Sequence, residues 1–121
     1  MPIHKILIVD DSPTERYYLS DILVRNGYQV TTAESGEEAL SKIKASKPEL
    51  ILMDVVMPGA NGFQVTRSIA RDPELQDVPV IICSSKNQET DKIWGLRQGA
   101  RDYLVKPVDA AELLSRIAAL G

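Results

Sequence analysis

Residues 6–15 read ILIVDDSPTE, and this stretch predicts how the chain folds. The consecutive aliphatic residues from Ile6 to Val9 are typical of a strand that is covered on both faces of a parallel sheet. Asp10 and Asp11 end the strand, and residues 12–15 have the pattern of a capping box with proline at the first helical position. The stretch therefore predicts a strand followed at once by a helix, with two carboxylates at the junction.

The same alternation of strand and helix continues along the chain. Further apolar runs occur at residues 28–32, 50–53, 80–83 and 103–105. The runs at 50–53 and 80–83 are continuous, which indicates central strands. The run at 28–32 alternates and the run at 103–105 is short with charged flanks, which indicates edge strands. We therefore predict an α/β fold, a (βα)5 doubly wound, five-stranded parallel sheet.

Signals for helix starts and ends lie between these runs. Residues 35–38 and 109–112 repeat the capping pattern, and residues 61–64 carry a weaker version of it. Apolar residues at helical spacing then predict the buried faces, which in the fourth helix are Ile93 and Leu96. For Trp94, on the same helix, we expect packing within the fold, with contact to a partner protein as the alternative. Gly27 and Gly99 lie where helices should end.

Composition and charge narrow the class of protein. The chain has 121 residues, of which 44% are hydrophobic and 26% charged, as in a soluble globular domain. We expect a single domain over residues 1–121 with no output domain, no signal peptide and no membrane segment, because no apolar run nears the ~18 residues that span a bilayer. The single cysteine, Cys83, fits a reducing, cytoplasmic location, and a net charge of −3 gives no reason to expect nucleic-acid binding.

Reactive side chains follow the predicted strands. They are Asp10 and Asp11 after the first strand, Asp54 after the third, Ser84 after the fourth and Lys106 after the fifth. Because parallel strands end at one edge of a sheet, these side chains should converge there, where ligands of open α/β sheets bind. Basic side chains on the helices, Arg16 among them, are instead expected to be solvated.

Several aspartates in one crevice require compensating positive charge. Each carboxylate pair at about 4 Å costs on the order of 4 kcal/mol at an effective dielectric of 20. Oxygen ligands with room for water suit Mg²⁺, and one Mg²⁺ together with Lys106 balances the negative charges. Such a site can accept a phosphoryl group, with Asp54 as nucleophile and Ser84 as hydroxyl donor. The single histidine, His4, lies before the first strand, at the opposite end of the sheet.

These residues resemble those of a known family. The chain is similar to the receiver domain of bacterial two-component response regulators in the Asp10-Asp11 pair, the segment from Asp54 through Met57-Pro58 to Gly62, Ser84, and Lys106-Pro107. The resemblance extends over nearly the whole chain and implies a flavodoxin-like receiver fold with the strand order 2-1-3-4-5. It also implies a signalling phosphoacceptor, not a turnover enzyme: such a domain takes a phosphoryl group from a histidine kinase and catalyses only its own phosphorylation and dephosphorylation.

The resemblance implies a role for each residue of the site. Asp54 would be the phosphoacceptor and a ligand of Mg²⁺, with Mn²⁺ as an alternative ion. Asp11 would bind the metal directly, Asp10 largely through water, and Val56 through its backbone carbonyl. Lys106 would contact the phosphoryl group.

The resemblance also implies a conformational switch and a set of partners. Ser84 would be the switch hydroxyl and Tyr103 the aromatic residue that changes rotamer with it. The Lys106-Pro107 bond would be cis, a form that costs little energy only before proline.

Residues 55–64 and 86–104 resemble the single-domain regulators of type IV pilus chemotaxis-like systems, the PilH type. This narrower resemblance implies a chemotaxis-type histidine kinase as partner and a role in twitching motility. The output would be either contact with a protein target on the face of the fourth helix, fifth strand and fifth helix, or action as a phosphate sink.

Other functions are compatible with the same topology. A Mg²⁺-dependent phosphatase with an aspartyl intermediate would want a second acid two residues after the nucleophile, where this chain has Val56. A flavodoxin-like cofactor carrier would want a loop rich in hydroxyls and glycine, where Asp10 and Asp11 would repel a nucleotide phosphate. An adaptor that is never phosphorylated would be distinguished by measuring the mass of the protein after phosphorylation is attempted.

Overall fold

The computed structural model, which describes residues 2–59 and 61–120, contains a parallel sheet with the strand order β2-β1-β3-β4-β5. The strands are β1 (Lys5–Val9), β2 (Gln29–Ala33), β3 (Leu50–Met53), β4 (Val80–Ser84) and β5 (Asp102–Val105). They confirm the predicted (βα)5 fold and its strand order, and each strand end lies within one residue of its predicted position. Ala60, within the segment from Asp54 to Gly62, lies outside the described residues.

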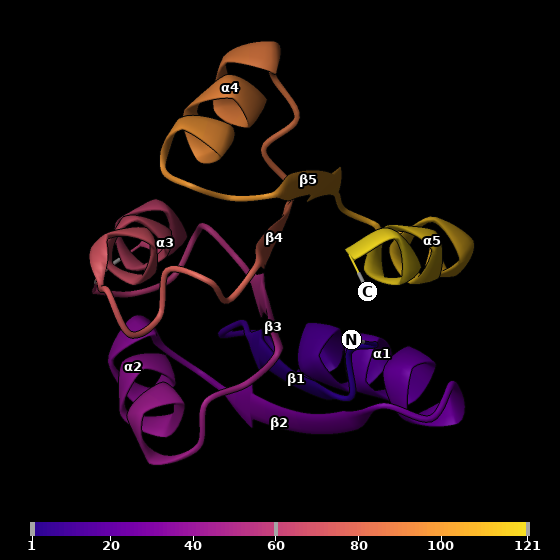
Figure 1. Ribbon diagram of the computed structural model, residues 1–121. Coiled ribbons are helices and arrows are strands. Elements are labelled where there is room, and N and C mark those ends of the chain that lie inside the picture. The colour runs from indigo at the N-terminus through magenta and orange to yellow at the C-terminus, as the bar shows by residue number, and fades with distance from the viewer. Residues whose placement is uncertain (1, 60, 121) are drawn as a thin grey trace.

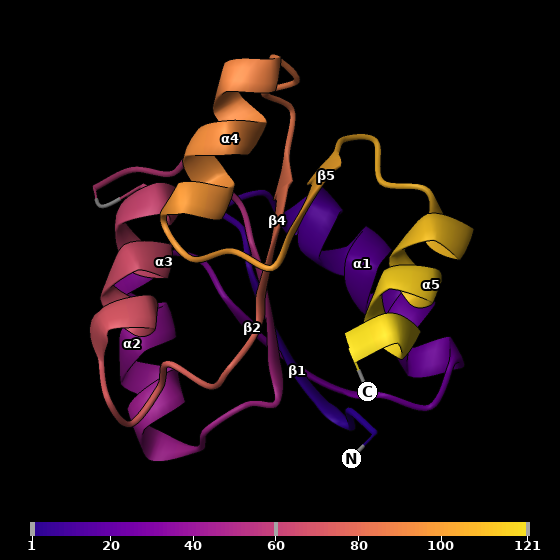
Figure 2. The same cartoon turned by 45° about the horizontal axis from the view of Figure 1, so that its top comes forward.

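Helices cover both faces of this sheet (Figure 1). They are α1 (Pro13–Arg25), α2 (Gly36–Ala45), α3 (Gly62–Arg71), α4 (Glu89–Arg97) and α5 (Ala110–Leu120). Figures 1 and 2 show α1 and α5 on one face and α2, α3 and α4 on the other. Among the helices that the structure describes, we find none with the length and apolar character of a membrane span.

The sheet separates two apolar cores. Successive residues of a strand point to opposite faces, so Leu7 and Val9 join the core on the α2 and α3 side, whereas Ile6 and Ile8 join the core on the α1 and α5 side. All four side chains are at most 1% exposed, as the continuous apolar run predicts. Burial of each contributes roughly 2 kcal/mol, so β1 is held firmly and the residues that follow it start from a fixed position.

Side-chain caps begin the helices, but their pattern differs from the sequence prediction. Ser12 Oγ accepts a hydrogen bond from Glu15 N at 3.2 Å, whereas Ser12 N donates to Asp10 Oδ1 at 2.9 Å and not to Glu15. The predicted capping box at α1 is therefore only half formed, because a site carboxylate takes the second hydrogen bond. The capping box between Asn61 and Gln64, predicted to be weak, is complete, with both hydrogen bonds at 3.0 Å.

The buried face of α4 is the second correction. Ile93 and Leu96, predicted to be core residues, are 43% and 48% exposed, and Trp94, expected to pack within the fold, is 50% exposed. The buried residue of α4 is Gly95, on which a Cβ would lie 3.0 Å from a ring carbon of Tyr103. The helix backbone itself rests on β4 and β5 at this glycine, which turns the neighbouring apolar side chains outward.

α3 begins in close contact with the chain that follows β3. A Cβ on Gly62, the first residue of α3, would lie 1.9 Å from the carbonyl oxygen of Asp54 and 2.9 Å from Cα of Val55. Gly62 N also donates to the Val55 carbonyl at 2.9 Å. Any side chain at this position would therefore displace the backbone that carries Asp54.

We predict that Gly62→Ala lowers the free energy of unfolding by about 3 kcal/mol, because the clash is with backbone atoms that cannot swing aside. Urea denaturation measures the loss. The control is Gly27→Ala: Gly27 has φ +88° and no atom within 4 Å of a Cβ, so the cost is the backbone strain of about 1 kcal/mol. Equal losses in the two variants would show that the contact with Asp54 is unimportant.

Candidate functional site

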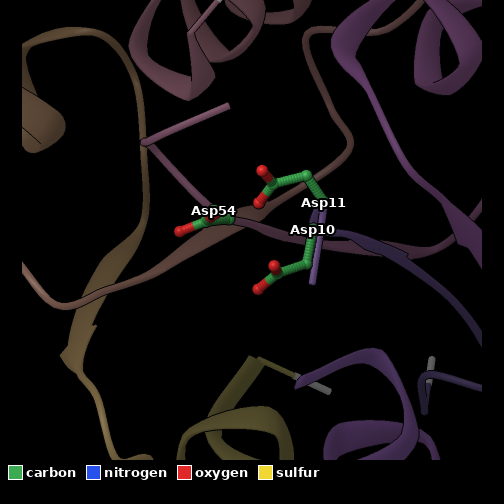
Figure 3. A group of neighbouring side chains, drawn as sticks. All are labelled: Asp10, Asp11 and Asp54. Atoms are coloured by element: carbon green, nitrogen blue, oxygen red, sulfur yellow. The ribbon is translucent and has the colours of Figure 1, made fainter. Parts of the chain in front are cut away.

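Three carboxylates meet at the edge where the strands end. β1 and β3 are neighbours with Val9 paired to Met53, so the residues that follow them, Asp10 and Asp54, leave the sheet side by side. Asp54 N donates to the Val9 carbonyl at 2.8 Å, which extends the sheet into the site. One oxygen from each of Asp10, Asp11 and Asp54 lies within 4.8 Å of the others. Figure 3 shows the three side chains extending from the ends of these two strands.

Lys106 joins two of these carboxylates. Its Nζ lies 2.7 Å from Asp10 Oδ2 and 3.2 Å from Asp54 Oδ1. Lys106 follows β5, and its backbone N donates to the Ser84 carbonyl at 2.8 Å, so the side chain reaches over the end of β4. The structure therefore brings together the aspartates, Lys106 and the end of β4 at one edge, as the positions after the strands predict.

The oxygens of Asp10 are already engaged. Oδ1 accepts from Ser12 N, Oδ2 accepts from Lys106, and the backbone carbonyl accepts from Arg16 Nη1 at 2.8 Å. Arg16 Nη2 also pairs with Glu34 at 2.9 Å, and its side chain is only 15% exposed. The prediction that Arg16 is solvated is therefore wrong. Arg16 binds both Asp10, in the loop after β1, and Glu34, in the loop after β2. No local pattern in the sequence indicates the pairing of Arg16 with Glu34.

The site retains an excess of negative charge. Three carboxylates beside one ammonium group leave two formal negative charges. Burial raises the pKa of Asp54, the charge of Asp10 raises it further, and Lys106 acts in the opposite direction. Burial lowers the pKa of Lys106, but the hydrogen bond to Asp10 and the charge of Asp54 outweigh it, so that this pKa is raised overall. A divalent cation has the charge that would balance the site.

The chemistry of the donors fits a hard divalent cation. All three candidate ligands are carboxylates, and Asp11 is exposed while Asp10 and Asp54 are buried. Asp11 and the second oxygen of Asp54 are therefore the groups best placed to accept a metal from solvent. Oxygen donors with access to water are the environment that Mg²⁺ prefers. Val56, which the resemblance implies as a carbonyl ligand, lies just after Asp54 in the segment between β3 and α3, with its side chain exposed.

Ser84 and Tyr103 hold the same residue of the loop that follows β4. Ser84 is buried, and its Oγ accepts from Lys86 N at 3.2 Å. Tyr103 is also buried, and its hydroxyl donates to the Lys86 carbonyl at 2.8 Å. Burial raises the pKa of the Tyr103 phenol. The two hydroxyls thus fix the path of the chain from β4 into α4. The peptide bond between Lys106 and Pro107 is cis.

One further acidic side chain near the site carries a polar atom without a partner. Glu15 Oε1 is buried and has no hydrogen-bond partner within the described part of the chain. Glu15 is connected to the site through its backbone N, which donates to Ser12 Oγ, while Ser12 N donates to Asp10 Oδ1. Burial raises the pKa of Cys83 to about 12, so this thiol is a packing group.

The raised pKa of Asp54 makes stability depend on pH. A folded-state pKa above the ordinary value of 3.8 means that the folded protein holds this proton more tightly than the unfolded chain. The contribution of Asp54 to stability is therefore fully present in acid and is lost as the pH rises through the raised pKa.

We predict that Asp54→Asn is more stable than the wild type at neutral pH without divalent cations, and that this advantage disappears below the ordinary pKa of aspartate. Urea denaturation at several pH values measures it. The control is Asp77→Asn, at the opposite edge of the sheet, where Lys47 holds the pKa of the exposed carboxyl below its usual range. That substitution should show no gain at neutral pH, and a gain as large as that of Asp54→Asn would refute the electrostatic explanation.

The sequence of the chain is similar to those of known proteins. Residues 6–118 match the family described as "Response regulator receiver domain". The chain is 55% identical to Protein PilH of Pseudomonas aeruginosa over 116 residues, which cover 96% of each chain. It is 34% identical to the phosphate regulon transcriptional regulatory protein PhoB of Escherichia coli, covering 96% of this chain but only 51% of PhoB. The chain thus spans almost all of PilH and about half of the transcriptional regulator.

Solved structures show the same architecture. Chemotaxis protein CheY4 of Vibrio cholerae is 31% identical and superposes with a TM-score of 0.91, covering 98% of this chain and 99% of that one. The receiver domain of the Francisella response regulator 1452 is 33% identical, with a TM-score of 0.89 and coverage of 97% and 95%. The sequence and the three-dimensional similarity therefore point to the same group of proteins.

Proposed function

Because this chain belongs to the response regulator receiver domain family, we propose that it is a stand-alone response regulator that accepts a phosphoryl group on Asp54 from a histidine kinase. One observation carries the proposal: Lys106 Nζ lies between Asp10 and Asp54, with Asp11 beside them. This arrangement supplies a nucleophile, a cation for the phosphoryl oxygens and a set of oxygen ligands within one cluster. The family acts in signalling, and turnover of an external substrate is not part of the proposal.

A metal ion at the carboxylates is the cofactor that the residues fit. Asp11 and Asp54 would hold Mg²⁺, or Mn²⁺, directly, Asp10 would act largely through water, and the Val56 carbonyl would complete the protein ligands. When bound, the ion supplies positive charge to the phosphoryl oxygens and neutralises the carboxylates. Asp10 is best suited to the indirect role because both of its carboxylate oxygens already accept hydrogen bonds.

The chain's own residues then perform the transfer. Asp54 attacks the phosphorus with one carboxylate oxygen, an O–P bond forms, and the N–P bond to the histidine of the kinase breaks. The electron pair of that bond returns to the imidazole, which takes up a proton. Lys106 stays close to Asp54 and stabilises the negative oxygens of the transferred group. Water later hydrolyses the acyl phosphate, which restores Asp54 and releases inorganic phosphate.

Ser84 and Tyr103 would convert phosphorylation into a change of surface. Ser84 Oγ now binds Lys86 N, and turning to a phosphoryl oxygen would release the loop that Tyr103 also holds through Lys86. The loop and α4 are then free to adopt a second arrangement, in which Tyr103 changes rotamer. A protein target would recognise the changed face formed by α4, β5 and α5.

The similarity to PilH supports a more specific role. At 55% identity over 96% of both chains, we propose a cytoplasmic regulator of pilus-based motility or chemotaxis-like signalling. Its phosphoryl donor would be a chemotaxis-type histidine kinase. Its output would be contact with a downstream protein, or the removal of phosphoryl groups from the kinase as a phosphate sink.

Metal binding predicts a gain in stability. Mg²⁺ at about 100 times its Kd should raise the free energy of unfolding by about 2.7 kcal/mol, because only the folded state assembles the ligands. Asp11→Asn should lose most of this gain, whereas Asp77→Asn, at the opposite edge of the sheet, should keep it. Thermal unfolding followed at increasing Mg²⁺ measures the effect, and an identical gain in all three proteins would rule out this site.

Phosphorylation predicts a covalent change at one residue. After incubation with Mg²⁺ and acetyl phosphate, mass spectrometry should detect one base-labile phosphoryl group on the wild type and none on Asp54→Ala. Asp77→Asn serves as the control and should be labelled normally. The absence of label on the wild type, or equal label on Asp54→Ala, would refute the proposal. Rapid release of phosphate from small phosphomonoesters would indicate the alternative, a Mg²⁺-dependent phosphatase.

A further inference from the structure

A groove between α3 and α4 combines arginines with the single tryptophan of the chain. Arg67 and Arg71 line it from α3, and Trp94 and Arg97 line it from α4. The groove has a volume of about 360 Å³, and its other lining residues are Ala70, Gln98 and Gly99. Figure 2 shows the two helices next to each other on the face of the sheet opposite α1 and α5.

Two close contacts fix the shape of this groove. Gly99 follows α4 with φ +110°, and a Cβ there would lie 2.6 Å from Cβ of Ala70, so the chain at the end of α4 packs directly against this side chain of α3. A Cβ on Gly95 would lie 2.9 Å from Cδ1 of Ile82 and 3.0 Å from a ring carbon of Tyr103, so the middle of α4 packs closely on β4 and β5. The contact of Gly99 with Ala70 therefore brings the ends of the two helices close together, and the contact at Gly95 holds α4 on the sheet.

The charge of the groove is uncompensated. Within residues 2–59 and 61–120, none of Arg67, Arg71 and Arg97 forms an ion pair with a carboxylate, although other basic side chains do, such as Arg16 and Arg116. The residues that line the groove include no aspartate or glutamate. Arg71 and Arg97 each lie in the last turn of a helix, where positive charge is favourable, but this does not account for Arg67 or for the exposed indole.

We propose that this groove docks an acidic segment of a partner protein, with carboxylates on the three arginines and an apolar or aromatic side chain on Trp94. Charge complementarity is the first argument, because the groove is locally cationic in a chain whose net charge is −3. The second is composition: arginine and tryptophan are the residues most often decisive in protein interfaces. The exposed Ile93 and Leu96 extend the apolar surface along α4. Such a mixed surface favours a peptide over a nucleic acid, which would need a series of phosphate contacts.

This site is separate from the one proposed for phosphorylation. Its residues come from the α3 side of α4, and none of them is an aspartate of the metal site, Ser84 or Lys106. Its test therefore requires neither Mg²⁺ nor a kinase.

Trp94 makes the proposal directly measurable. Because it is the only tryptophan, its fluorescence reports on the groove without a label. The probe is a short peptide rich in glutamate and phenylalanine, and the matched control peptide has glutamine in place of every glutamate. We expect the acidic peptide to change the fluorescence of Trp94 saturably and to bind more weakly as the salt concentration rises, while the glutamine peptide has no effect.

Substitutions locate the binding on the protein. With a fluorescein label on the acidic peptide, Arg67→Glu, Arg71→Glu and Arg97→Glu should each weaken binding about tenfold. Arg101→Glu removes an exposed arginine outside the groove and should leave affinity unchanged. Arg67→Lys keeps the charge and should retain most of the binding, which separates loss of charge from loss of folding.

The same experiments can overturn the proposal. Equal binding of the two peptides, no binding of the acidic peptide to the wild type, or an equal loss in Arg101→Glu would each contradict a specific acidic partner. Inorganic phosphate or a short oligonucleotide that changes Trp94 fluorescence at lower concentration than the peptide would show that the groove binds phosphate groups instead.

Discussion

The contact of Lys106 with Asp10 and Asp54 is the interaction on which the rest of the structure depends. Carboxylates this deeply buried are costly unless a cation stays beside them, and removing the cation of a buried ion pair, which leaves its carboxylates uncompensated, typically costs about 3–5 kcal/mol. The cation follows β5, the outermost strand on this side of the sheet, and its backbone N donates to Ser84 of β4, so Lys106 reaches the aspartates across the end of β4. The order of the strands therefore determines which charged side chains meet at the site.

Much of this could be predicted from the sequence because the decisive patterns are local. The run from Ile6 to Val9 is apolar at every position, which only a strand covered on both faces requires, and the structure buries all of it. Asp10, Asp54 and Lys106 each follow such a run directly, and parallel strands bring their ends together whatever the rest of the chain does. The convergence of the site therefore follows from strand direction alone.

The errors arise where a contact with a site residue or with another element overrides the helix pattern. The hydrogen bond that Ser12 N was expected to give to Glu15 goes to Asp10, because a carboxylate already fixed at the end of β1 competes for it. Arg16 looks like an ordinary helix-surface charge, yet it lies against the loop after β1 and pairs with Glu34. Asp10 lies only two residues before Ser12, but the capping pattern assigns the bond to Glu15; Glu34 lies 18 residues from Arg16, so the spacing along the chain gives no sign of that pair.

Gly95 has a consequence for how α4 moves. Glycine inside a helix costs about 1 kcal/mol relative to alanine, so α4 is held together less strongly than its length suggests. At the same residue its backbone touches the ring of Tyr103 with no methyl group between them. Because no side chain of α4 lies between its backbone and the Tyr103 ring, any displacement of the ring toward the helix must move the α4 backbone itself.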